Sequence, residues 1–338
     1  MNVHIFGAKD SPSIANFALR KTAEDNSSDF SQSAVDAVKK DFYVDDLLKS
    51  LPSEQQAIEL SSEMIDLLRR GGFRLTKFMS SSKKVLAAVP ELERANPSFD
   101  LTMDKLPVER ALGMRWNVEA DVFEFKAIAS DKPETKRGIL STVASLYDPI
   151  GLVAPVTLLA KCQLQRLWQL KIDWDSQLPD KELVEWRQWK SALPALSNVK
   201  IPRCYKSNII TKSSIQTKDP KDVQLHNFSD ASEIGYGVAS YVRTTFIDGT
   251  VACALVFGKS RAAPLRKITI PRLELQAAVL AVRIGEMIQR VIEIKFNRVY
   301  YWTDSEIVLK YIQNESKRYT VYVGNRIAEI QEKTEISQ

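Results

Sequence analysis

Two groups of acidic residues in this sequence have the types and spacing needed to bind metal ions. The first is the pair Asp45-Asp46, which follows Tyr43-Val44 in a short run of strand-forming residues. Adjacent like charges repel each other and resist desolvation unless they are exposed or neutralised. Mg²⁺ suits such oxygen ligands, because it binds through one or two carboxylates and completes its shell with water and substrate phosphates. Taken alone, the pair is more typical of an exposed turn.

The second group consists of three carboxylates in the last third of the chain. Residues 223–230 alternate with a period of two, which predicts a strand with Asp230 on one face. After Pro271, which suits a first helical turn, apolar residues recur at helical spacing, and Glu274 lies one step off that stripe. Residues 298–305 predict a strand that ends in Asp304. Each acid alone is typical of a protein surface, but three that converge can hold two metal ions.

The elements that must position these three acids follow one another in a specific order. Gly235-Tyr236-Gly237 predicts a turn, and residues 238–245 and 251–258 predict two further strands. An amphipathic stretch over 307–312 predicts a helix after Asp304. Strand, hairpin, helix, strand and helix is the layout of the ribonuclease H fold.

Three motifs carry the resemblance to ribonucleases H: Phe-Ser-Asp-Ala-Ser at 228–232, Arg-Leu-Glu-Leu at 272–275 and Trp-Thr-Asp-Ser at 302–305. The resemblance implies that Asp230, Glu274 and Asp304 bind two Mg²⁺ (or Mn²⁺) ions about 3.5 to 4 Å apart. It also implies hydrolysis of the RNA strand of an RNA·DNA hybrid. Ribonucleases H usually add a last Asp from a C-terminal helix, which this chain lacks, so we expect Asn325 or Glu329 to close the site.

Four segments in the first third, in register with one another, resemble the second half of a reverse transcriptase palm. They are residues 6–13 with Phe-Gly and Ser-Pro pairs, the Tyr-Val-Asp-Asp turn at 43–46, a strand over 72–77 and a hairpin at 112–116. The resemblance makes Asp45 and Asp46 polymerase metal ligands. It assigns nucleotide and primer contacts to Gly7, Ser11, Pro12, Lys77, Gly113 and Trp116.

The polymerase part is expected to be incomplete. Reverse transcriptases carry a further metal-binding Asp and the fingers before the Phe-Gly pair, and only five residues precede Phe6. The Ser- and Asp-rich stretch 25–33 replaces further palm structure, as a deletion or a mispredicted exon boundary would. We therefore expect no reverse transcriptase activity from this chain alone.

The sequences of two linking segments indicate a more specific family. Residues 138–152 and 259–275 resemble BEL/Pao long-terminal-repeat retrotransposons, so the chain is identified as a member of that family, a fragment of its Pol polyprotein. We expect an α/β chain: a partial palm (1–118), a helical thumb or connection (119–199), a Lys-rich linker (200–221) and a ribonuclease H-like domain with a mixed sheet and flanking helices (222–338). Trp186 and Trp189, three residues apart, are expected in the helical core rather than on nucleic acid.

Composition agrees with this reading. The 338 residues carry a net charge of +5, a modest basic bias that fits an RNA·DNA hybrid or other nucleic acid as partner. Three separated cysteines and two histidines disfavour disulfides, zinc sites and a histidine-based triad. The chain has neither a signal-peptide pattern nor an apolar run of membrane-spanning length, so we expect no membrane partner and an intracellular place, cytoplasmic or nuclear. The oligomeric state stays open.

Two alternatives to an active nuclease remain. The first is a nucleic-acid-binding remnant without turnover, which the missing fourth Asp and the missing palm Asp favour. The second is an aspartic peptidase, which such polyproteins also encode. Its Asp-Thr-Gly or Asp-Ser-Gly turns are absent from this sequence, so it ranks last.

Overall fold

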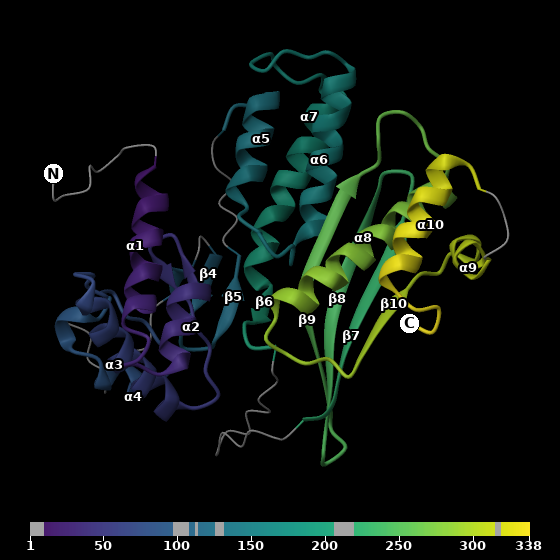
Figure 1. The fold of residues 1–338 in the computed structure, drawn as a ribbon. Helices are drawn as coiled ribbons and strands as arrows, with labels where there is room; N and C mark the ends of the chain where they lie inside the picture. Colours follow the sequence, from purple (N-terminus) through teal and green to yellow (C-terminus); the bar gives the residue numbers. More distant parts are fainter. Residues whose placement is uncertain (1–9, 97–107, 112–113, 126–131, 206–219, 315–318) are drawn as a thin grey trace. The chain divides into compact units, whose positions relative to one another are not determined.

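A computed structural model describes residues 10–96, 108–111, 114–125, 132–205, 220–314 and 319–338. The chain has an α/β fold with mixed sheets and helices, as expected (Figure 1). It divides into two compact units. Unit 1 comprises Met1–Leu112 and Trp116–Asp121, and unit 2 comprises Gly113–Arg115 and Val122–Gln338.

Unit 1 is built mainly from helices that pack around a small apolar core. Its helices are α1 (Ser11–Asp25), α2 (Gln32–Lys40), α3 (Glu54–Arg70), α4 (Lys83–Ala88) and a 3₁₀ turn at Glu91–Glu93. The hydroxyls of Ser31 and Ser53 accept hydrogen bonds from backbone N–H groups of the first turns of α2 and α3, which fixes where these helices begin. The core contains Leu19, Val38, Met64 and Leu67.

Three short strands belong to unit 1, and a fourth straddles its boundary. Strands β1 (Phe42–Tyr43) and β2 (Asp46–Leu47) form a two-residue hairpin in which Tyr43 pairs with Asp46. Strand β3 covers Val108–Ala111, and β4 (Met114–Asn117) crosses from one unit into the other along the chain.

Unit 2 begins with β5 (Val122–Glu124), which pairs antiparallel with β6 (Lys200–Pro202). Between these strands lie α5 (Lys136–Ser145), α6 (Ala154–Gln169), α7 (Asp180–Ala192) and a 3₁₀ turn at Leu193–Asn198. Trp186 is 1% exposed, and its ring stacks on that of Trp189 with centroids 5.0 Å apart. The two rings therefore belong to the core of the helices, as predicted.

A four-stranded mixed sheet forms the rest of unit 2 together with three helices (Figure 1). The strands are β7 (Pro220–Ala231), β8 (Gly235–Phe246), β9 (Val251–Ala262) and β10 (Arg298–Trp302), and the helices are α8 (Ile270–Val291), α9 (Glu306–Gln313) and α10 (Val321–Lys333). The order in the sheet is β10-β7-β8-β9, with β10 parallel to β7 and the other pairs antiparallel.

Helix α8 joins two apolar cores. Its predicted stripe, which includes Leu273, Ala277, Ala281 and Ile288, packs on the sheet against residues such as Leu225. The opposite side of α8 packs against α9 and α10 in a second apolar cluster. Because a helix that is apolar on both sides is buried in a core, α8 is the central element of this layer.

The turn before α6 lies against the outer edge of β9. The Gly258 N–H donates to the Ile150 carbonyl at 2.8 Å, and the Ser260 hydroxyl donates to the Ala154 carbonyl at 2.9 Å. Gly151 has a φ of +74°, and a Cβ built on it would lie 1.8 Å from the Gly258 carbonyl oxygen. Only glycine allows this approach and this backbone conformation.

The segment expected as a linker, 200–221, lies within unit 2. Lys200–Pro202 already forms β6, β7 begins at Pro220, and residues 206–219 lie outside the described residues. The sequence pattern missed this because the contacts of 150–165 with β9 join positions about a hundred residues apart. Among the helices that the structure describes, none is long and apolar enough to cross a membrane.

Candidate functional site

Asp230 and Asp304 occupy equivalent places at the ends of neighbouring parallel strands. Phe228 of β7 pairs with Trp302 of β10, and each acid follows its strand's paired residue by two positions. The Ser229 hydroxyl donates to the Trp302 carbonyl at 3.0 Å, which joins the two strands at this point. Because parallel strands keep their register, the backbone brings both acids to the same end of the sheet.

Glu274 reaches the same end from the N-terminal part of α8. Its carboxylate accepts a hydrogen bond from the Ser305 hydroxyl at 2.5 Å, and Ser305 is the residue next to Asp304. Ser305 is buried and also caps α9, because its side-chain oxygen accepts from the Val308 N–H at 3.3 Å. The sequence analysis gave Ser305 no role, although a Ser before an amphipathic stretch is a known signal for a helix start.

The side chains of the three acids are not gathered into one cluster. The Asp230 carboxylate accepts from the neighbouring Ala231 N–H at 2.6 Å, and both Asp230 and Asp304 are exposed. Within the described ranges, no three His, Cys, Asp or Glu side chains lie where they could hold a single metal ion. The oxygen donors fit the chemistry of Mg²⁺, and exposed carboxylates change rotamer on a fast timescale.

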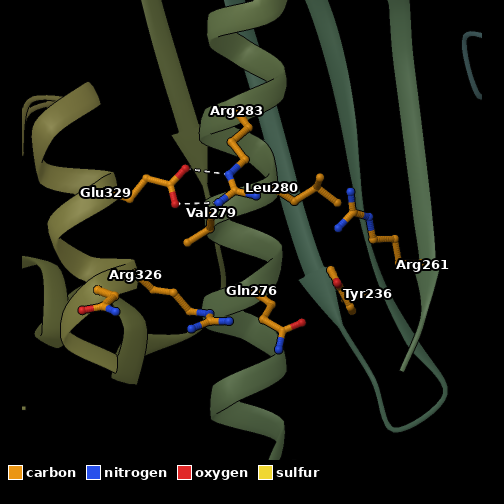
Figure 2. Close-up of a pocket in the computed structure, with 9 residues that line it drawn as sticks. Tyr236, Arg261, Gln276, Val279, Leu280, Arg283, Arg326 and Glu329 are labelled. Atoms are coloured by element: carbon orange, nitrogen blue, oxygen red, sulfur yellow. Dashed lines mark hydrogen bonds and ion pairs between the residues drawn. The ribbon is translucent and has the colours of Figure 1, made fainter. Parts of the chain in front are cut away.

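Of the two residues expected to close the site, Asn325 and Glu329, the second is engaged in an ion pair. The Arg283 guanidinium donates to both Glu329 oxygens at 2.6 and 2.7 Å, an ion pair drawn in Figure 2. Arg283 is nine residues after Glu274 on α8, about 13.5 Å along the helix axis at a rise of about 1.5 Å per residue. Asn325 lines the same pocket as Glu329. Helix α10 thus directs Glu329 to Arg283 in the middle of α8, while Asn325 and Gln276 line the same pocket.

An aromatic surface lies on the sheet face that carries Asp230. The rings of His226, Phe228, Tyr300 and Trp302 are stacked or tilted against one another, with Phe228 and Trp302 centroids 5.7 Å apart and 11° between planes. Phe228 is 44% exposed and Trp302 48% exposed. His226 and Phe228 alternate with Asp230 along β7, and the parallel pairing of β7 with β10 brings the Tyr300 and Trp302 rings beside them.

His226 has both ring nitrogens engaged. Its Nδ1 accepts from the Trp302 Nε1–H at 3.1 Å, and its Nε2 lies 3.0 Å from the Gln224 side-chain oxygen. Burial, together with the positive charge of Arg243, lowers the pKa of His226 below its ordinary value. The ring is therefore a strand residue whose two nitrogens are both hydrogen-bonded.

Asp45 and Asp46 of unit 1 stand at the exposed β1–β2 hairpin. Val44, at its tip, has a φ of +59°, a region that β-branched residues rarely adopt. Strained residues of this kind cluster at functional sites, although strain alone assigns no function. The hairpin that was expected from the sequence is present.

The other residues assigned to the polymerase part are scattered along unit 1. Ser11 and Pro12 form the first turn of α1, and the buried Trp116 donates its Nε1–H to Asp121 at 2.9 Å. The expected strand over 72–77 does not form, since Gly72 and Lys77 both have positive φ angles, which interrupt an extended chain. Gly7 and Gly113 lie outside the described residues.

Comparison with known proteins gives one family match. A family model for the Pao retrotransposon-like RNaseH-like domain matches residues 135–305, about half of the chain. The match begins at the residue that caps α5 and ends at Ser305, so it includes Asp230, Glu274 and Asp304 together with the helices that pack on β9. No curated protein matches the chain.

Proposed function

This chain belongs to the Pao retrotransposon-like family with an RNaseH-like domain, and on that premise we propose that unit 2 hydrolyses the RNA strand of RNA·DNA hybrids. The observation that carries the proposal is the parallel register of β7 and β10, with Glu274 hydrogen-bonded to the residue after Asp304. The backbone brings three carboxylates from separate elements to one end of the sheet, and carboxylates are the donor type that hydrolytic metal sites use.

We assign Asp230, Glu274 and Asp304 as the residues that would hold Mg²⁺ or Mn²⁺. Bound ions of this kind supply the charge that lowers the pKa of a water and stabilises a leaving oxygen. Ser305 orients Glu274 through its hydroxyl, and the Ser229 hydroxyl keeps the ends of β7 and β10 together. The chain itself therefore contributes the placement of negative charge at the sheet end.

Cleavage of a hybrid whose RNA strand is labelled tests this proposal. Asp304→Asn should abolish Mg²⁺-dependent cleavage while leaving the thermal unfolding of the chain unchanged, because Asp304 is exposed. Asp222→Asn is the matched control: Asp222 lies on the same strand as Asp230, about 26 Å away at about 3.3 Å per residue. Cleavage that persists in Asp304→Asn, or a purified wild-type chain that never cleaves, would remove the proposal.

A nucleic-acid-binding role without turnover is the second candidate. It is favoured by the finding that, in the described part of the chain, the three acids are not gathered around one point. Tight binding of a hybrid with no cleavage at any concentration of Mg²⁺ or Mn²⁺ would establish this role in place of the first.

For unit 1 we propose a palm-derived domain that does not polymerise DNA alone. Asp45 and Asp46 are exposed at a hairpin, and the described residues offer no third acid beside them. Primer extension by the purified chain in Mg²⁺ would contradict this proposal.

A further inference from the structure

A pocket of about 250 Å³ lies in unit 2, where α8 and α10 face the start of β8 and the end of β9 (Figure 2). Tyr236 and Arg261 line it from the strands, and Gln276 and Arg283 line it from α8. Arg326 and Glu329 line it from α10. Figure 2 shows the guanidinium of Arg261 directed from β9 toward α8. Four elements thus line one concave surface, and three of them, β9, α8 and α10, bring charged side chains to it.

The pocket carries excess positive charge. Its charged side chains are three guanidinium groups and one carboxylate, a balance of +2. Glu329 is already bound by Arg283 through two hydrogen bonds. The Arg326 guanidinium lies 3.7 Å from the centroid of the Tyr322 ring and donates to the Tyr322 carbonyl at 3.0 Å, so it has a fixed position without a carboxylate partner.

Arg261 is the least constrained of the three. Its side chain is exposed, and it has no ion pair or hydrogen bond with any other described residue. A planar guanidinium with free donors matches the geometry of a phosphate and binds it through two parallel hydrogen bonds. Among the described residues, Arg261 and Arg326 thus form no ion pair with an acidic side chain, and the pocket presents both guanidinium groups.

We propose that this pocket binds a backbone phosphate of the nucleic-acid substrate, away from the bond that is cut. The proposal rests on the proposed function for its substrate class. Gln276 is two residues after Glu274 on α8, and Tyr236 pairs with Ala231, the neighbour of Asp230. The pocket thus extends along α8 from Gln276, close to Glu274, to Arg283, so a strand bound at Glu274 passes it with a neighbouring phosphate.

Binding of an RNA·DNA hybrid by the full chain carrying Asp304→Asn tests the pocket without cleavage, for instance by fluorescence anisotropy in Mg²⁺ over a series of salt concentrations. In this background, Arg261→Gln should weaken binding about fivefold to tenfold. It should also reduce the slope of log K against log salt by about one, the contribution of about one phosphate contact. Arg261→Lys keeps the charge and should retain the slope. Arg290→Gln, an exposed position on the same helix as Arg283, should change neither quantity.

The outcomes separate this inference from the proposed function. Unchanged affinity and salt slope in Arg261→Gln overturn the proposal that the pocket binds a phosphate, even if the wild-type chain cleaves the hybrid. An equal loss in Arg290→Gln also overturns it, because the effect would then be one of net charge. Weaker binding in Arg261→Gln by a chain that never cleaves supports the pocket while the nuclease proposal fails.

Discussion

The Ser305 hydroxyl donates to the Glu274 carboxylate at 2.5 Å, and this contact links the N-terminal part of α8 to the loop that carries Asp304. The same oxygen accepts from the Val308 N–H and so begins α9. The Ser305 side chain therefore both caps α9 and orients the Glu274 carboxylate.

Ser305→Ala should lower both stability and metal affinity. Loss of a helix N-cap costs about 1 kcal/mol, and removal of a partner of a metal ligand typically costs at least tenfold in metal affinity. We expect the Mg²⁺ concentration for half-maximal cleavage to rise about tenfold, with rescue by Ser305→Thr. The control is Thr135→Ala, which removes the cap of α5. An equal shift in the Mg²⁺ dependence of this control would mean that Ser305 acts only as a helix cap.

Gly151→Ala should destabilise unit 2 strongly. A positive φ costs a residue with a side chain about 1 to 2 kcal/mol, and here the added Cβ would also meet the Gly258 carbonyl oxygen at 1.8 Å. We expect a loss of more than about 3 kcal/mol, since the two costs add. Hydrogen exchange of the β9 amides and the thermal transition measure it. Gly249→Ala is the matched control, because Gly249 has a φ of +82° but open space around it, and should show the backbone cost alone.

The Arg283–Glu329 pair should stabilise the protein only at pH values at which Glu329 is ionised. Hydrogen bonds from Arg283 hold the pKa of Glu329 below its ordinary value of 4.5. A depressed folded-state pKa gives stability that is present above the unfolded-state value and is lost as pH falls through the folded-state value. Glu329→Gln should therefore cost about 0.5 to 1 kcal/mol near pH 7 and progressively less below pH 4.5. Urea unfolding of this variant and of Glu332→Gln measures the difference, and a cost independent of pH would contradict the ion pair.

His226 should remain neutral when an unperturbed histidine is half protonated. Burial first, and Arg243 second, lower its pKa from the ordinary value of 6.5. As pH falls through 6.5, the unfolded chain takes up a proton that the folded ring resists, so the free energy of unfolding should decrease. Titration of the ring by NMR checks the shift, and Arg243→Gln should raise the pKa part of the way back. A ring that titrates at its ordinary value in the wild-type chain would disprove this environment.

Local periodicity predicted much of the sheet and of α8. Alternation over 223–230 became β7, and the stripe that includes Leu273 and Ile288 became the face of α8 that packs on the sheet. These features depend on residues that are close together in the sequence, so the local pattern of apolar residues is enough to predict them. The Tyr43-to-Asp46 hairpin was predicted for the same reason.

Features that depend on distant contacts were not predictable in the same way. The Arg283–Glu329 pair joins positions 46 residues apart, so nothing near Glu329 indicates that it faces the middle of α8. The close approach of Gly151 and Gly258 likewise has no local signal beyond two glycines. The expected strand over 72–77 does not form because Gly72 and Lys77 have positive φ angles, and in the described part of the chain an isolated bridge between Phe78 and Arg94 lies beside it.

The contact of the α6 region with β9 bears on any attempt to isolate the nuclease part. A shortened protein that starts near Pro220 would lose two hydrogen bonds to this region. The Ile150 carbonyl accepts from the Gly258 N–H, and the Gln165 side-chain amide donates to the Ala263 carbonyl. The edge strand β9 would then expose unpaired backbone N–H and C=O groups to neighbouring molecules, which is a recognised route to aggregation. Truncations intended for crystallisation should therefore retain the helices from Thr135 onward.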